Sequence, residues 1–470
     1  MKWMLHIPGQ RARELSPGEH PPENAWLRPD TAGPGLLGVL LAHPELTRIH
    51  LRDPDPELLP LLHATAIRAL RIDGQLPAEA MAQLRLPSTL EELILRDQAL
   101  RTLEPLVGTQ LRRLVLSGTP ISHTALAPLA KLPLEHLDLS RTPLIDFHAL
   151  RAALQVRSAH DMAARMALSE AWEDVIEFKF EEGFGEFWVD QEGPASDEAA
   201  IPLPDAEQPL PGSRPDWARW QVLRSSADVF GLDLGALVGP MPGLMALAGL
   251  PLKSLDLSDT PVADLSFVAG MSGLKTLGLG QTGVVELGPV KDLQALQALD
   301  LSAAPVASLV DIGSLSSLKA LRLSEQHLDL AQAQALLQCT ELSALALHNA
   351  TFSEGALGVL GRLPALRQLS LHGGDLIDAD LAGLAQAKGL EDLDLTRCSL
   401  ADQAPALAKL TQLKRLSLRK SSLNDGQLVY LEGLKDLEHL ALSFCRATKA
   451  PAKALAGTLA GVEVILAFRE

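Results

Sequence analysis

Three glycines and two histidines are the residues of this sequence whose spacing first suggests chemistry. Gly278, Gly280 and Gly283 form a G-x-G-x-x-G pattern, which in dinucleotide-binding proteins turns the backbone around a phosphate. That chemistry needs a βαβ unit around the glycines, and the neighbouring sequence offers none. We therefore expect no nucleotide and no other cofactor.

His348 and His372 occupy equivalent places in neighbouring segments, and Asp392 and Asp394 follow in the next segment. Imidazoles and a carboxylate could form half of a metal site. Polar neighbours on a wet surface explain the same pattern, and no H-E-x-x-H or C-x-x-C motif accompanies it. We expect no metal, and we treat His348, His372 and Asp394 as candidate contacts to a partner.

Nucleophilic catalysis has no visible basis either. The sequence contains no G-x-S-x-G and no G-x-x-x-x-G-K-[ST] motif, and the adjacent His160 and Asp161 have no serine or cysteine that the sequence can place beside them. Cys339, Cys398 and Cys445 are too few and too scattered for a disulfide framework, which indicates a reducing compartment. We expect a protein that is not an enzyme.

A repeated hexapeptide explains most of the chain. It has the form L-x-x-L-x-L and recurs every 21 to 25 residues within two runs. Well-marked copies are LEELIL (90–95), LRRLVL (111–116), LEHLDL (134–139), LKSLDL (252–257), LKTLGL (274–279), LQALDL (296–301), LKALRL (318–323), LSALAL (342–347), LRQLSL (366–371), LEDLDL (390–395), LKRLSL (413–418) and LEHLAL (437–442). Weaker copies begin at Leu46, Ile67, Val229 and Val462.

This pattern resembles that of the leucine-rich-repeat family, L-x-x-L-x-L-x-x-N/C-x-L. The last two leucines alternate like a short strand with one buried face, which needs neighbours to cover it. We expect an α/β solenoid, a horseshoe with a parallel β-ladder on its concave face. Its convex segments should mix 3₁₀ turns, in repeats near 22 residues, with α-helices, in repeats near 24 residues.

The resemblance divides the chain into four parts. We expect an N-terminal cap with a Pro-rich region at 1–45, a first run of repeats at 46–154, an insertion at 155–228, and a second run with a C-terminal cap at 229–470. At the family's N/C position, where a side chain bonds neighbouring turn backbone, this chain has threonine, serine or cysteine. The residues are Thr119, Thr142, Thr260, Thr282, Cys398, Ser421 and Cys445. We therefore interpret Cys398 and Cys445 as buried, reduced thiols of this ladder, and Cys339 as a packing residue on the convex side.

Polar residues between the leucines should line the concave surface. Their charge is acidic towards the middle of the chain and basic near its C-terminal end. The candidate contacts read from this pattern are Asp138, Arg141, Asp256, Asp259, Asp300, Arg397, Arg415, Arg419 and Lys420.

The insertion has a different composition. Residues 155–220 hold fifteen Asp or Glu against five Lys or Arg, and eight of the seventeen aromatic residues. A helix around 159–172, a hairpin, and a Pro-rich acidic segment at 192–215 are indicated. Two interpretations stay open: a solvated insertion packed onto the solenoid, or a partner-contacting element that decides specificity. In the second, Phe184, Phe187 and Trp188 near the hairpin tip would be anchors.

The net charge of −17 and the pI near 5.2 disfavour nucleic acid and anionic membranes as partners, and favour a basic protein. The start of the chain has no apolar segment typical of a signal peptide, and no long apolar run occurs, so we expect a cytoplasmic protein. The oligomeric state is left open.

The repeats resemble those of bacterial cytosolic and effector-type members of the family. The resemblance implies a non-catalytic protein-binding scaffold that recognises a basic protein through its concave face and insertion. One version is an immunity protein or inhibitor that neutralises a toxin or enzyme. The alternatives are a secreted bacterial effector acting on host proteins, and an enzyme whose site lies in the insertion.

Overall fold

The structure is a computed structural model. It describes residues 3–6, 13–14, 26–29, 32–142, 150, 231–237 and 243–465, apart from 75, 97, 99, 101, 120, 122–124, 375, 377–379 and 460. The insertion at 155–228, with Phe184, Phe187 and Trp188, lies outside these residues. The chain forms two compact units: unit 1 holds residues 1–145 and 152–211, and unit 2 holds residues 146–151 and 212–470.

Unit 1 begins with short antiparallel strands and continues as a parallel ladder. β1 (Trp3–His6) pairs antiparallel with β2 (Arg13–Glu14) and with β3 (Trp26–Pro29). β3 pairs in parallel with the first strand of the repeats, so the N-terminal strands lie against that edge of the ladder. The parallel strands are β4 (Arg48–Arg52), β5 (Ala69–Asp73), β6 (Glu92–Leu95), β7 (Arg113–Val115) and β8 (His136–Asp138). α1 (Gly35–Ala42) precedes β4, and the segments between the parallel strands are η1 (Pro56–Ala64), α2 (Ala78–Met81), η2 (Glu104–Leu106) and η4 (Ala127–Lys131).

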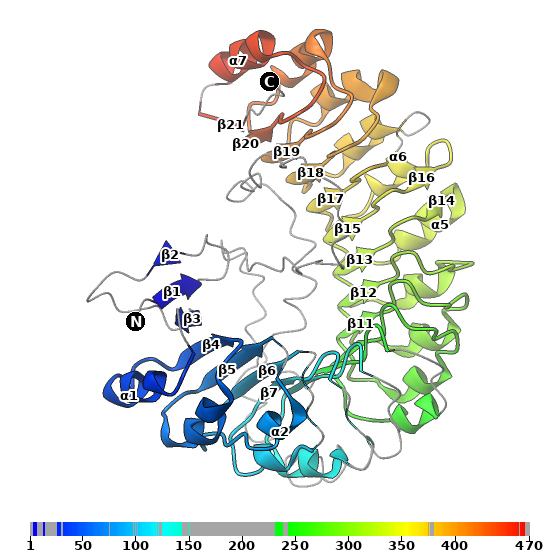
Figure 1. The fold of residues 1–470 in the computed structure, drawn as a ribbon. Helices are drawn as coiled ribbons and strands as arrows, with labels where there is room; N and C mark the ends of the chain where they lie inside the picture. The colour runs from blue at the N-terminus through cyan, green and yellow to red at the C-terminus, as the bar shows by residue number, and fades with distance from the viewer. Residues whose placement is uncertain are drawn as a thin grey trace, which may run out of the picture. The chain divides into compact units, whose positions relative to one another are not determined.

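Unit 2 repeats one strand many times in strict register. The central leucines pair with one another from strand to strand, as Leu255 does with Leu232 and Leu277. Its ladder strands are β9 (Gly231–Asp233), β10 (Ser254–Asp256), β11 (Thr276–Gly278), β12 (Ala298–Asp300), β13 (Ala320–Arg322), β15 (Ala344–Ala346), β17 (Gln368–Ser370), β18 (Asp392–Asp394), β19 (Arg415–Ser417), β20 (His439–Ala441) and β21 (Glu463–Ile465). Within unit 2 the ladder strands lie along one side and the helical segments along the other (Figure 1).

The segments opposite the ladder of unit 2 are mostly 3₁₀ turns. They are η6 (Leu244–Leu247), η7 (Ser266–Gly270), η8 (Gly288–Asp292), η9 (Val310–Ser314), α5 (Leu330–Leu336), α6 (Ala356–Leu360), η10 (Leu381–Gln386), η11 (Ala401–Lys409), η12 (Asp425–Leu431) and α7 (Lys449–Thr458). A small second sheet joins β14 (His327–Leu328) to β16 (Thr351–Phe352) in parallel.

The expected mixture of 3₁₀ and α segments is confirmed, but repeat length alone does not decide between them. The short repeats carry η7, η8 and η9, as expected, whereas the longer repeats carry both α-helices (α5, α6) and 3₁₀ helices (η10, η11, η12). One cause is visible in η11, where Pro405 removes a backbone donor. A capping box does not decide the choice: α5 starts with one, in which the Asp329 carboxylate accepts from the N–H of Gln332, and the 3₁₀ segment η12 starts with one too.

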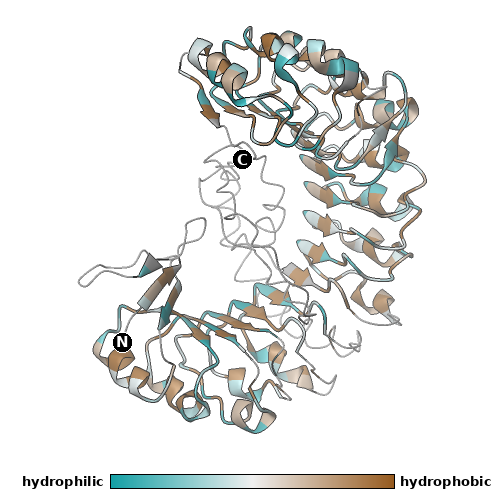
Figure 2. Ribbon diagram, turned by 45° about the horizontal axis from the view of Figure 1, so that its top comes forward, coloured by the Kyte–Doolittle hydropathy of each residue, from teal (hydrophilic) through white to brown (hydrophobic). Residues whose placement is uncertain are grey.

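Leucine side chains fill the space between the two layers. Leu345 and Leu393 are 0 % and 1 % exposed, and their counterparts in the other repeats are equally buried. Figure 2 shows hydrophobic and hydrophilic residues alternating along the strands, as expected of strands with one buried face. The core of each unit is therefore one continuous stack of leucines.

Removing one leucine of this stack should leave a cavity that the rigid neighbours cannot close. We expect Leu345→Ala to lower the free energy of unfolding by about 2–5 kcal/mol. Leu330→Ala is the matched control, because Leu330 is 42 % exposed and its truncation should cost far less. Urea unfolding followed by circular dichroism measures both variants, and equal losses would contradict the predicted core.

Candidate partner-binding surface

The turn that follows each ladder strand has the same backbone shape throughout. We number every repeat from the first leucine of L-x-x-L-x-L, and we call the seventh to tenth residues of successive repeats the turn edge. The eighth residue is left-handed in every repeat of unit 2 where the structure describes it, with φ from 51° to 73°. The residues are Ala236, Asp259, Gln281, Ala303, Glu325, Asn349, Gly373, Arg397, Lys420 and Phe444.

The ladder requires this conformation, because its hydrogen bonds continue through the turn. The N–H of Leu301, a sixth residue, donates to the carbonyl of Arg322 in the next repeat at 2.9 Å. The N–H of Ala303, an eighth residue, donates to the carbonyl of Ser324 at 2.9 Å. The N–H of Ala304 then closes the turn on the carbonyl of Leu301 at 3.1 Å. The backbone of the turn edge is thus fixed, while its eighth side chain is left outside the ladder.

Aspartates at the fifth position hold the turn from within. Asp256 Oδ1 accepts from the backbone N–H of Ser258 at 3.1 Å and from its hydroxyl at 2.6 Å. Asp300 makes the same two bonds with Ser302 at 2.9 and 2.5 Å. These bonds give both aspartates a structural role in their own turns.

Two further predicted contact residues share this arrangement. Asp394 Oδ1 accepts from the N–H of Thr396 at 2.9 Å, and Asp138 Oδ1 accepts from that of Ser140 at 2.8 Å. Asp256 and Asp394 are only 4 % and 8 % exposed. The recurring D-L-S and D-L-T tripeptides are the sequence pattern from which this bond between the fifth and seventh residues could have been predicted.

Arg415, another predicted contact, is held by an ion pair on the ladder. Its guanidinium lies 2.6 Å from Asp392 Oδ2 and 2.5 Å from Oδ1, and Gln368 donates to Oδ2 at 3.2 Å. Asp392 is 2 % exposed, and this burial raises its pKa although Arg415 favours the charged form. Because the pair is bidentate and mostly buried, Arg415 is less available to a partner than an exposed arginine would be.

The two predicted histidines are neighbours. The ring centroids of His348 and His372 lie 5.6 Å apart at an angle of 50°, and His348 Nε2 is 3.0 Å from Ser370 Oγ. Burial lowers the pKa of His348 to about 4, helped by the nearby Arg322 and His372, so His348 is neutral near pH 7. Among the residues that the structure describes, no group of three or more His, Cys, Asp or Glu side chains could hold a metal ion.

The remaining predicted contacts lie on the turn edge. Asp259, Arg397 and Lys420 are exposed, and so is Arg141 in unit 1, whose Nε donates to Ser117 Oγ at 3.3 Å. The structure adds Phe444, which the sequence analysis missed although it stands at the same eighth place. The Nζ atom of Lys420 is 5.8 Å from the centroid of that ring.

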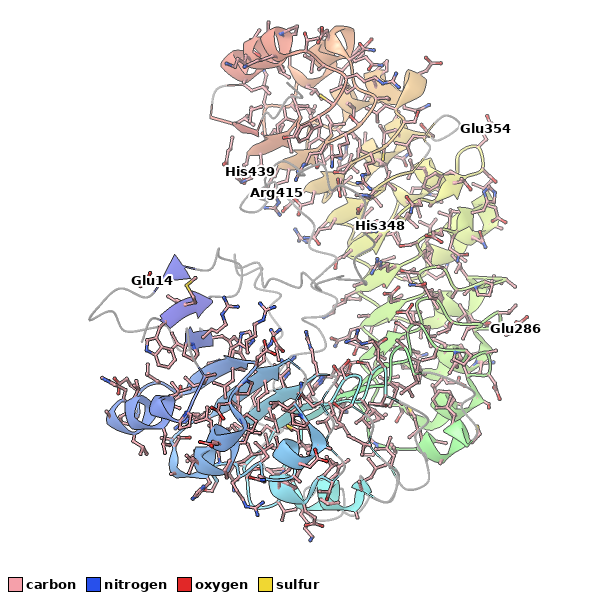
Figure 3. The ribbon with its side chains drawn as sticks, viewed as in Figure 1. Glu14, Glu286, His348, Glu354, Arg415 and His439 are labelled. Carbon is pink, nitrogen blue, oxygen red and sulfur yellow. The ribbon has the colours of Figure 1, made fainter. Side chains whose placement is uncertain are left out.

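The turn edge and the helix side are separate surfaces. Figure 3 shows His348, Arg415 and His439 on the strand side of unit 2, and Glu286 and Glu354 on the opposite, outer side. Side chains of the strand side are therefore presented together, repeat after repeat.

A leucine-lined strand, a left-handed turn and a short return helix recur in the same register along each ladder. The chain is a leucine-rich-repeat solenoid. No family model and no curated protein matches it.

Solved structures of other leucine-rich-repeat solenoids are similar to this one. An internalin of Listeria monocytogenes has 18 % sequence identity and a TM-score of 0.45, and the match covers 82 % of each chain. A leucine-rich-repeat protein of Leptospira interrogans has 16 % identity and a TM-score of 0.45, with 92 % of this chain and 87 % of that chain covered.

Within the described residues, every helix is too short or too polar to span a bilayer.

The N/C position of the solenoid combines two hydrogen-bond patterns. Cys398 Sγ lies 2.9 Å from the carbonyl of Leu371 in the preceding repeat, which is the ladder bond expected of it. The threonines differ from the expectation: Thr260 and Thr282 bond the sixth carbonyl of their own repeats, at 2.5 and 2.7 Å. The threonine hydroxyl bonds within its own repeat because the turn brings the carbonyl of the sixth residue close to the ninth side chain.

The three cysteines have protonated, shielded thiols. Burial raises the pKa of Cys398 to about 12 and that of Cys339 to about 11, and it also raises the pKa of the half-buried Cys445. Cys339 Sγ lies 3.3 Å from the carbonyl of Ile312, on the helix side, as expected of a packing residue.

Alkylation needs the thiolate, so raised pKa values should protect these residues. We expect iodoacetamide at pH 8 to label Cys339 and Cys398 far more slowly in the folded protein than in urea, with Cys445 the fastest of the three. Mass spectrometry of the digested protein measures each rate. Fast labelling of Cys398 in the folded state would contradict its place as a ladder thiol, and Cys398→Ser should leave any binding intact.

Proposed function

We propose that this chain is a non-catalytic scaffold that binds a basic protein through its turn edge. One observation carries the proposal: the eighth residue of each repeat has a backbone fixed by the ladder and a side chain outside it. In unit 2 these side chains include Asp259, Glu325, Arg397, Lys420 and Phe444. Nothing in the ladder requires acid, base or aromatic character at that place, so their variety favours recognition.

Rigidity supports a binding role. Binding costs free energy when side chains and loops at the interface must become ordered. A surface whose backbone is already fixed reduces this entropic cost. Repeats also present their side chains at a regular step of about 4.8 Å, which suits an extended contact. The solenoid therefore supplies an ordered surface without a conformational change.

Charge supports a basic partner. The net charge is −17, and opposite fields raise the rate at which two proteins associate. Asp259 and Glu325 are exposed on the turn edge, whereas Asp256 and Asp300 add negative charge behind it while holding their turns. Neutralisation of a basic toxin or enzyme is the version of this function that we favour.

Aromatic residues of the insertion are proposed to add specificity. Phe184, Phe187 and Trp188 lie outside the described residues, and the proposal for them rests on the sequence alone: an acidic, aromatic-rich segment interrupts otherwise regular repeats.

The test begins with affinity capture of the partner from the native host, followed by kinetics on the purified pair. We expect Asp259→Lys with Glu325→Lys to slow association by roughly tenfold at low salt, and the difference to shrink at high salt. The matched control is Glu286→Lys with Glu354→Lys, which makes the same charge change on the outer side of unit 2. Equal rates for the two double variants would contradict the proposed surface.

A further inference from the structure

The C-terminal part of the turn edge in unit 2 differs from the rest in charge. Three successive repeats place Arg397, then Arg419 and Lys420, then Phe444 and Arg446 along it. We call these five residues the cationic edge. Arg397, Lys420 and Arg446 are exposed, and Arg419 and Phe444 are half-buried.

Three carboxylates close to the cationic edge in sequence are already engaged elsewhere. Asp394 accepts from the N–H of Thr396, and Asp392 pairs with Arg415. Asp425 accepts from the N–H and hydroxyl of Thr448, at 2.6 and 2.8 Å. Within the described part of the chain, Arg397, Lys420 and Arg446 form no ion pair with a carboxylate, although the protein has a large excess of acidic residues.

Phe444 gives the cationic edge an apolar end. Its ring faces the Lys420 ammonium at 5.8 Å, and its backbone φ of 59° fixes the direction in which the side chain leaves the turn. A ligand can use the ammonium and the ring together. Its carboxylate approaches the Lys420 ammonium while an adjacent apolar side chain of the same ligand covers the Phe444 ring.

We propose that the cationic edge binds an acidic segment of a protein partner, with carboxylates on Arg397 and Lys420 and an apolar side chain against Phe444. This inference rests on the proposed function and assigns the partner chemistry of one part of the turn edge. Two repeat steps of about 4.8 Å span about 10 Å, the length of roughly three residues of extended peptide. A short acidic stretch on an otherwise basic partner therefore fits.

The dimensions and charge favour a peptide over a nucleic acid. A nucleic-acid backbone gains affinity from many phosphates in a row, and among the described residues the cations of this edge occupy three successive repeats. The field of a chain with net charge −17 opposes the approach of a long polyanion, whereas a local carboxylate cluster on a basic protein meets attraction overall.

The probe is a fluorescently labelled peptide of alternating glutamate and leucine, mixed with the full chain and followed by fluorescence anisotropy. We expect binding that weakens with salt and falls by about tenfold in Arg397→Glu with Lys420→Glu. Arg397→Gln with Lys420→Gln should give a smaller loss in the same direction. Lys388→Glu with Lys409→Glu changes two exposed lysines outside the turn edge, in the repeats of Gly373 and Arg397; it is the matched control and should bind like the wild type.

The inference is overturned if the peptide does not bind, if its glutamine counterpart binds equally well, or if the cationic-edge and control variants bind alike. If a single-stranded DNA of similar length bound more strongly than the peptide, the ligand of the cationic edge would be a nucleic acid, and the inference would also be overturned. None of these peptide and DNA results tests capture of the basic partner through Asp259 and Glu325. Failure of this inference is therefore distinguishable from failure of the proposed function.

Discussion

Lateral hydrogen bonding between successive repeats is the interaction on which the rest of the structure depends. A single L-x-x-L-x-L strand cannot bury its leucines, and it becomes stable only when the next repeat covers it and accepts its N–H groups. The ladder continues beyond the strand into the turn, where the N–H of Ala303 reaches Ser324. Each repeat must therefore place its eighth residue in the left-handed region, which costs roughly 1–2 kcal/mol for a residue other than glycine.

That constraint separates structural positions from positions free to vary. The leucines fill the core, fifth-position aspartates such as Asp300 hold the seventh N–H, and ninth-position threonines such as Thr282 bond turn carbonyls. The eighth side chains of unit 2 lie outside the buried core, although their backbone is among the most strictly fixed. The side-chain type changes along the turn edge, for example from Asp259 to Lys420, without serving the ladder. We therefore relate this variation to contacts with another molecule, and this is the physical basis of the proposed binding function.

The sequence predicted the ladder and the shielding of Cys398, because leucine periodicity and burial are local properties. It could not predict the environment of Arg415, whose partner Asp392 lies in the preceding repeat and is recognised only once the strands are aligned. The turn bonds of Asp256 and Asp300 could not be predicted either, because strand alternation indicates which face a residue is on, and not whether the following turn bonds it. Repeat length also does not record Pro405, which removes a backbone donor inside the 3₁₀ segment η11.

The most direct test of the account is the stability of substitutions at one eighth position. Ala303 has a φ of 54°, and Ala307 in the same repeat is an exposed residue outside the left-handed region. We expect Ala303→Gly to raise the free energy of unfolding by up to about 1 kcal/mol and Ala303→Val to lower it by more than about 1 kcal/mol. Ala307→Val should change it little. If Ala303→Val were as stable as Ala303→Gly, the left-handed turn would not constrain the ladder, and the argument for the turn edge as the variable surface would lose its foundation.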